Sequence, residues 1–151
     1  KGLPDYVKAY KYRAMIYEMQ MNYDAAIEDY NIYLLDHNGD FTAYVGRGNA
    51  YAATEVYDAA IENFNQAIAL QPQIAELRFD RGFFYLKMKN YDAALVDFDK
   101  AVQLKHPDLK LVHYNKGIAH FYKGQKTKAC QAWSFAGSIA KEYVEKNCLN
   151  D

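Results

Sequence analysis

Proline, cysteine and tryptophan are scarce in this chain of 151 residues, which has three prolines, two cysteines and one tryptophan. Its formal net charge of −1 provides no broad field to attract nucleic acid or an anionic membrane surface. No apolar run approaches the ~18 residues that a bilayer span requires. These absences exclude nucleic acid as a partner and exclude membrane insertion. The composition, 51% hydrophobic and 25% charged, is that of a soluble globular protein.

The residues of familiar catalytic sites are missing as well. The chain has only two serines, Ser134 and Ser138, and neither belongs to a recognisable triad. It contains no HExxH motif, no phosphate-binding loop and no nucleophile elbow. His113 and His120 lie seven residues apart, but two histidines without a third ligand make a poor zinc site. We therefore expect no enzyme, no metal site and no cofactor.

What the chain does have is repetition. The octapeptide Tyr23 to Tyr30 returns at Tyr57 to Phe64 and at Tyr91 to Phe98, each time 34 residues further on. A fixed period of this length is typical of arrays in which each unit buries its apolar face against its neighbours. Alignment on the octapeptide gives four units, at about 7–40, 41–74, 75–108 and 110–143, and a C-terminal cap at about 139–151. We expect a single domain over residues 1–151.

Each unit is predicted to contain two helices, because apolar residues recur at spacings of three and four and never alternate over any length. In the second unit, Asp40 is placed to cap a helix from about Phe41 to Ala53. A second helix runs from about Tyr57 to Leu70, where Pro72 stops it. Asp108 repeats the capping role in the fourth unit. The predicted fold class is all-α.

Small residues recur where the two helices of a unit would cross. The first helices carry Ala14, Gly48, Gly82 and Gly117 at one aligned position, and the second carry Ala26, Ala60, Ala94 and Ala129. Four residues after each of these alanines comes a large ring, namely Tyr30, Phe64, Phe98 or Trp133. We expect close backbone approach at the small residues, with the rings filling the space around them.

Together these positions resemble the tetratricopeptide repeat. The second unit shows the pattern best, with Tyr44, Arg47, Gly48, Tyr51, Tyr57, Ala60, Phe64, Ala67 and Pro72 in order and spacing. The resemblance implies a right-handed α-solenoid of four helix-turn-helix repeats plus a C-terminal capping helix. It also implies a non-catalytic scaffold that binds a peptide or helical segment of a partner protein in a concave groove.

The resemblance assigns a set of residues to that concave face, contributed by the first helix of each unit. The set comprises Lys11, Tyr12, Met15, Met19, Asn49, Phe79, Asp80, Phe83, Tyr114, Asn115, Ile118, Phe121 and Tyr122, and Lys87 faces the same side. It is mostly apolar and aromatic, with acidic groups in the middle, and such a face can anchor an extended peptide or a helix. The alternative for each ring is simple packing between adjacent repeats.

One family ligand is argued against by the residues. Tetratricopeptide domains that bind the acidic tails of heat-shock chaperones use a clamp of lysines, asparagines and an arginine. Lys11 fits that clamp, but Met15, Gly46, Glu76 and Asp80 stand where Asn, Asn, Lys and Arg are needed. Two acids would repel a carboxylate. We expect no binding of a chaperone tail, and the identity of the protein partner stays open.

The two cysteines are the remaining candidates for special chemistry. If a turn near residues 137–139 reverses the chain into a terminal helix, Cys130 and Cys148 fall opposite each other and a disulfide is geometrically feasible. The alternative is two separate small residues, one buried and one on a frayed tail.

The closing segment Gly124 to Trp133 resembles that of tetratricopeptide proteins from Bacteroides-type bacteria. This favours export to the periplasm, with the cytoplasm as the alternative compartment.

A second function class stays open at this level. The first helix of an array leaves an apolar face uncovered unless another segment caps it. The chain could therefore serve as a structural or oligomerisation module of a longer multi-repeat or multidomain protein, and a homo-oligomer is one form of this.

Overall fold

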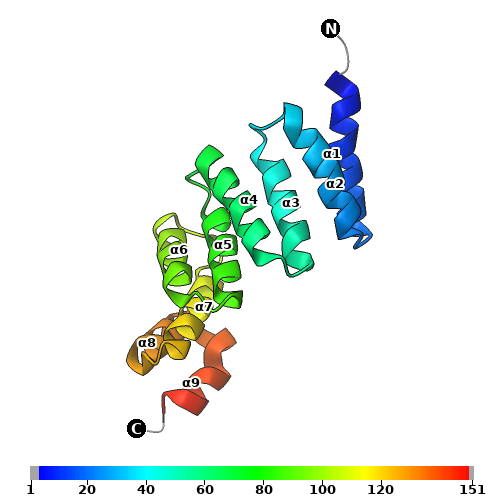
Figure 1. Ribbon diagram of the computed structural model, residues 1–151. Helices are drawn as coiled ribbons and strands as arrows, with labels where there is room; N and C mark the ends of the chain where they lie inside the picture. Colours follow the sequence, from blue (N-terminus) through cyan, green and yellow to red (C-terminus); the bar gives the residue numbers. More distant parts are fainter. Residues whose placement is uncertain (1–3, 150–151) are drawn as a thin grey trace. The chain divides into compact units, whose positions relative to one another are not determined.

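The computed structural model describes residues 4–149, with eight helices in consecutive antiparallel pairs followed by a short C-terminal cap (Figure 1). The pairs are α1 (Pro4–Met19) with α2 (Tyr23–Asp36), α3 (Phe41–Ala53) with α4 (Tyr57–Leu70), α5 (Ala75–Lys87) with α6 (Tyr91–Gln103), and α7 (Leu109–Tyr122) with α8 (Lys126–Ala136). A 3-10 helix, η1 (Gly137–Ala140), leads into α9 (Lys141–Asn147). The all-α fold of paired helices is confirmed. No helix within residues 4–149 is both long enough and apolar enough to span a bilayer.

The helices form two compact units, Lys1–Gln73 and Ile74–Asp151. The core of the first unit joins α1, α2 and α3 through buried small and aromatic side chains: Ala14, Ala26, Tyr30, Tyr33, Leu34, Ala43 and Ala50. The second unit has one buried cluster around Phe98 of α6 and another around Trp133 of α8. In both units, alanine at the crossings and a ring beside it make the core.

The helix ends follow the capping residues expected from the sequence. The Asp40 carboxylate accepts a hydrogen bond from the Thr42 backbone N–H at 3.0 Å, and Asp108 accepts one from the Leu111 N–H at 2.9 Å. Each satisfies a donor that the first turn of a helix leaves free. The predicted bounds of α3 and α4, and both capping roles, are confirmed.

The small residues of the first helices lie against the rings of the second. A Cβ atom on Gly48 would lie 3.0 Å from the Phe64 ring, and one on Gly82 would lie 2.9 Å from the Phe98 ring. At Gly117 it would lie only 2.2 Å from Cδ1 and Nε1 of Trp133. Glycine at this position of the last three repeats therefore leaves room for the opposing ring, and the closest approach is to the largest of these rings, Trp133.

At another repeated position, an arginine of the first helix of a pair bonds to an Asp or Asn side chain of the second helix. The Arg13 guanidinium donates to both carboxylate oxygens of Asp29 at 2.6 and 2.7 Å, and Arg81 does the same to Asp97 at 2.7 Å for both contacts. In the second repeat, Arg47 donates to the neutral Asn63 at 2.8 Å instead. Bidentate pairs of this kind fix two helices in register. These arginines therefore stabilise the helix pairs.

The C-terminal cap is tied to α8. Gly137 has φ +66°, a left-handed conformation that suits glycine, and it reverses the chain after α8. A disulfide joins Cys130 to Cys148, whose Cα atoms are 5.8 Å apart. Tyr143 of α9 packs its ring 5.0 Å from that of Trp133. The cap therefore covers the end of the helix pair α7–α8, and its disulfide is of a kind that persists in oxidising compartments.

Candidate peptide-binding site

An open groove with a volume of ≈ 540 Å³ lies in the second unit, between α5, α7 and the turn that leads into α6. Its lining residues are Phe83, Leu86, Lys87, Lys89, Tyr91, Tyr114, Asn115, Ile118 and Tyr122. Those from α7 are spaced by one, three and four positions, so they share one face of that helix. The groove is therefore formed by one face of α5, one face of α7 and the turn between α5 and α6, all within a single compact unit.

Six of the residues assigned to the concave face come together here, namely Phe83, Lys87, Tyr114, Asn115, Ile118 and Tyr122. Two of the rings among them each pack on one side against another tyrosine ring of the protein. Tyr122 stacks on Tyr91 with centroids 5.6 Å apart and planes 9° apart, yet it remains 64% exposed. Tyr114 meets Tyr143 edge-on at 5.6 Å, and burial together with the side-chain hydrogen bond of Tyr114 to Tyr143 raises the pKa of Tyr114. Rings fixed on one side and open on the other are suited to anchoring a ligand.

Asn115 contributes less than the sequence suggested. It is buried, and its amide Nδ2–H donates to the Leu111 carbonyl at 2.9 Å within α7. One N–H of its amide is therefore used by the helix itself, and the groove wall here is mainly apolar and aromatic.

Three other assigned residues of the second unit lie outside the groove. Phe79 packs against Phe98 at 5.8 Å and against His106 at 4.9 Å. Phe121 packs against Trp133 at 5.7 Å and lines a different hollow, beside α9. The structure uses these two rings for packing, which was the stated alternative to ligand contact.

Asp80 is the third of these residues. Burial raises its pKa to about 6, and Glu76 raises it further while His106 opposes the shift. A carboxylate this desolvated is disfavoured in its charged form. Asp80 does not line the groove.

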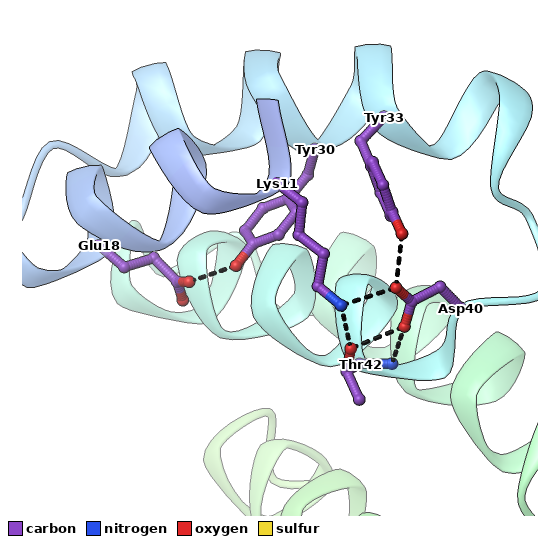
Figure 2. Close-up of polar contacts among 6 residues, drawn as sticks. All are labelled: Lys11, Glu18, Tyr30, Tyr33, Asp40 and Thr42. Atoms are coloured by element: carbon purple, nitrogen blue, oxygen red, sulfur yellow. Dashed lines mark hydrogen bonds and ion pairs between the residues drawn. The ribbon is translucent and has the colours of Figure 1, made fainter. Parts of the chain in front are cut away.

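In the first unit, Lys11 is occupied by the protein's own groups (Figure 2). Its Nζ donates to the Asp40 carboxylate at 2.6 Å and to the Thr42 hydroxyl at 2.7 Å. Asp40 also accepts the Tyr33 hydroxyl at 2.7 Å. Burial alone would raise the pKa of Asp40, but these hydrogen bonds hold it well below its usual range. Lys11 therefore already has a carboxylate partner, and it ties α1 to the start of α3.

A second contact in Figure 2 joins α1 to α2. The Tyr30 hydroxyl donates to Glu18 at 2.5 Å, and burial raises the pKa of both groups. A Cβ atom on Gly46 would lie 2.2 Å from the Tyr30 Oη. Gly46 thus makes room for a tyrosine, which is why it carries no ligand-binding side chain.

The other assigned residues of the first unit are on its surface. Tyr12, Met15 and Met19 lie exposed along α1, and Asn49 is exposed on α3. They remain accessible to a partner.

Three groove residues were missed by the sequence assignment, namely Leu86, Lys89 and Tyr91. Tyr91 belongs to the repeated octapeptide. Because the octapeptide is nearly identical between units, its residues were expected to have only a structural role. The place of Tyr91 beside Tyr122 shows that a repeated residue can line a groove when a variable one stacks on it. Among residues 4–149, no three His, Cys, Asp or Glu side chains are grouped to hold a metal ion.

Paired helices at a 34-residue period define a helical-repeat protein whose exposed surfaces are available for recognition. A TPR repeat model matches residues 48–89, and a tetratricopeptide repeat model matches residues 75–106. Residues 48–106 are therefore similar to tetratricopeptide repeats.

Solved structures with a similar fold include MamA. One crystal structure of MamA superposes with a TM-score of 0.83 and 22% identity, covering 94% of this chain and 82% of that chain. MamA 41-end from Desulfovibrio magneticus RS-1 gives a TM-score of 0.84 and 21% identity, covering 95% of this chain and 81% of that chain. At these identities the similarity establishes the fold alone. No curated protein sequence matches the chain.

Proposed function

We propose that this protein is a non-catalytic interaction module that binds a peptide or helical segment of another protein in the groove of its second unit. The observation that carries the proposal is the ring-lined groove of ≈ 540 Å³, open to solvent. Its volume lies within the range of roughly 300–1,000 Å³ that is usual for ligand sites. Tetratricopeptide domains are in general protein-interaction modules, which supports the same reading.

The chemistry of the lining favours side-chain anchors over a small polar ligand. Phe83, Tyr91, Tyr114 and Tyr122 supply broad aromatic faces, and Leu86 and Ile118 supply aliphatic surface between them. Aromatic rings that are already ordered lose little conformational entropy on binding. A segment with one or two large apolar side chains fits this lining best.

Replacing Phe83 and Tyr122 by alanine together is expected to weaken peptide binding by more than roughly tenfold, because central aromatic anchors carry most of the energy of such interfaces. The test selects peptides from a random dodecapeptide library displayed on phage, using the wild-type protein as bait. The affinities of the selected peptides for wild type and variant are then measured by fluorescence anisotropy.

Phe135→Ala is the matched control. Phe135 is also an exposed ring of the second unit, but it lies on α8 and does not line the groove. Peptides that bind the double variant as tightly as wild type, an equal loss in Phe135→Ala, or a selection that yields no peptide would each contradict the proposal.

A second candidate function, assembly through α1, is favoured by one specific comparison between repeats. Ala43 and Ala50 of α3 are fully buried in the cluster shared with α2, and the aligned Val112 of α7 is fully buried in the cluster shared with α6. The residues of α1 at the positions of Ala43 and Ala50 are Ala9, which is exposed, and Ile16, which is 51% exposed. The face that takes a preceding helix in α3 and α7 is thus open in α1.

We infer that a second copy of the chain can cover this face. The molar mass from light scattering is then expected to rise with protein concentration, and Ile16→Glu is expected to restore the monomer, since a buried unpaired carboxylate is costly at an interface. Leu35→Glu, on an even more exposed leucine of α2, serves as the control. A constant monomer mass at every concentration would rule out this assembly.

A further inference from the structure

The groove of the second unit is unevenly charged. Lys87 and Lys89 are two of its nine lining residues, and none of the nine is acidic. Both lysines are exposed, and neither takes part in an ion pair given for residues 4–149. The groove therefore offers two cationic groups beside apolar walls.

Three other lysines of the structure are paired with aspartates. Lys116 pairs with Asp99, and Lys123, just beyond the groove residue Tyr122, pairs with Asp92. Lys11 pairs with Asp40 in the same way. Lys87 and Lys89 have no such partner, which is also true of exposed lysines elsewhere such as Lys105 and Lys110, but only Lys87 and Lys89 line the groove.

The fold does not require lysine at either position. The residues aligned with Lys87 in the other repeats are Met19, Ala53 and Tyr122, and those aligned with Lys89 are Met21, Glu55 and Gly124. Lys89, Met21 and Glu55 share a left-handed backbone at the turn between paired helices, so that conformation belongs to the repeat and not to lysine. Because the scaffold accepts apolar and even acidic residues there, the two positive charges are features of this repeat alone.

We propose, as a consequence of the groove-binding function above, that the ligand is a protein segment in which a large apolar side chain is followed closely by aspartate or glutamate. The apolar side chain packs among Phe83, Tyr114 and Tyr122, while the carboxylates face Lys87 and Lys89. Lys87 holds its Nζ 5.1 Å from the centroid of the Phe83 ring, so one cation sits directly at the aromatic wall.

Nearby acids do not cancel this charge. Asp80 and Glu76 are on the same helix as Lys87, but Asp80 is seven residues away, about 10 Å along the axis at 1.5 Å per residue. That exceeds the Debye length of about 8 Å at physiological ionic strength, and burial already disfavours the charged form of Asp80. Asp92 is already held by Lys123.

The experiment selects peptides from the same random dodecapeptide library on two baits in parallel, wild type and the double variant Lys87→Gln with Lys89→Gln. Wild type is expected to enrich aspartate and glutamate next to an aromatic or aliphatic residue, and the variant is expected to lose the acidic preference while keeping the apolar one. For each selected peptide, the change of Asp to Asn and Glu to Gln is expected to weaken binding to wild type by roughly tenfold at low salt, and by twofold or less to the variant.

Lys105→Gln with Lys110→Gln is the matched control. It removes the same two charges from exposed lysines of the second unit that do not line the groove. Equal loss of acidic preference in this control would assign the effect to net charge and overturn the proposal. Selected peptides without acidic enrichment would overturn it while leaving groove binding intact, whereas a selection that yields no peptide would overturn both.

Discussion

Gly117→Ala is expected to destabilise the second unit by about 2 kcal/mol or more, although alanine is the better helix former by about 1 kcal/mol. The new methyl group would lie 2.2 Å from Cδ1 and Nε1 of Trp133. That ring has no room to withdraw, because Trp133 is fully buried between Phe121 and Tyr143. Its Nε1–H also donates to the Tyr114 carbonyl at 3.2 Å.

The measurement is chemical denaturation followed by the fluorescence of Trp133, the single tryptophan, which reports on the second unit. Gly39→Ala, which lies in the first unit and is followed by circular dichroism, is the control, because nothing lies within 4 Å of a Cβ atom placed there. In the double variant with Trp133→Phe, followed by circular dichroism, part of the loss is expected to be recovered, since Phe98 leaves 2.9 Å at the aligned Gly82. A Gly117→Ala protein as stable as wild type would refute this account of the repeated glycine.

The fold was predictable because its determinants are local and repeated. The caps at Asp40 and Asp108, the stop at Pro72 and the spacing of apolar residues each act within a few residues of the chain. Repetition then supplied the same information several times, so that the small residue and the ring of each helix crossing could be recognised in the sequence.

The site was predictable only in part, because alignment tells which face a residue occupies but not what already fills that face. Lys11 was assigned to ligand binding, yet the fold supplies its carboxylate from Asp40, 29 residues later. Phe121 was assigned to the same face, but the ring of Trp133 lies against it. In each case the contact joins residues that are at least 12 positions apart in the sequence, and alignment of the repeats alone does not show that it forms.

Residues that repeat between units and residues that vary both contribute to the groove. Tyr91 is part of the octapeptide and is therefore repeated in other units. It nevertheless lines the groove, where Tyr122 stacks on it. Specificity then arises from how a constant ring is combined with side chains that only one repeat carries, such as Lys87 and Lys89.

Asp40→Ala is expected to destabilise the first unit by about 3 kcal/mol, because one carboxylate performs three tasks there. It caps α3 through the Thr42 N–H, it accepts the Tyr33 hydroxyl of α2, and it pairs with Lys11 of α1 (Figure 2). Its loss would leave a half-buried ammonium and a buried phenol without their acceptor. Calorimetric unfolding of the whole chain measures the change in stability.

Asp108→Ala is the matched control for capping alone, since Asp108 caps α7 through the Leu111 N–H, and it is expected to cost only about 1 kcal/mol. The pH dependence separates the ionic part. The pKa of Asp40 is lower in the folded protein than its ordinary value of 3.8, so its stabilisation is present above that value and is lost as the pH falls below it. The difference between wild type and Asp40→Ala should therefore be full at neutral pH and should shrink in acid. The difference could instead be no larger than that of Asp108→Ala, or could fail to change with pH. Either result would show that Asp40 acts only as a helix cap and does not link the three helices through its charge.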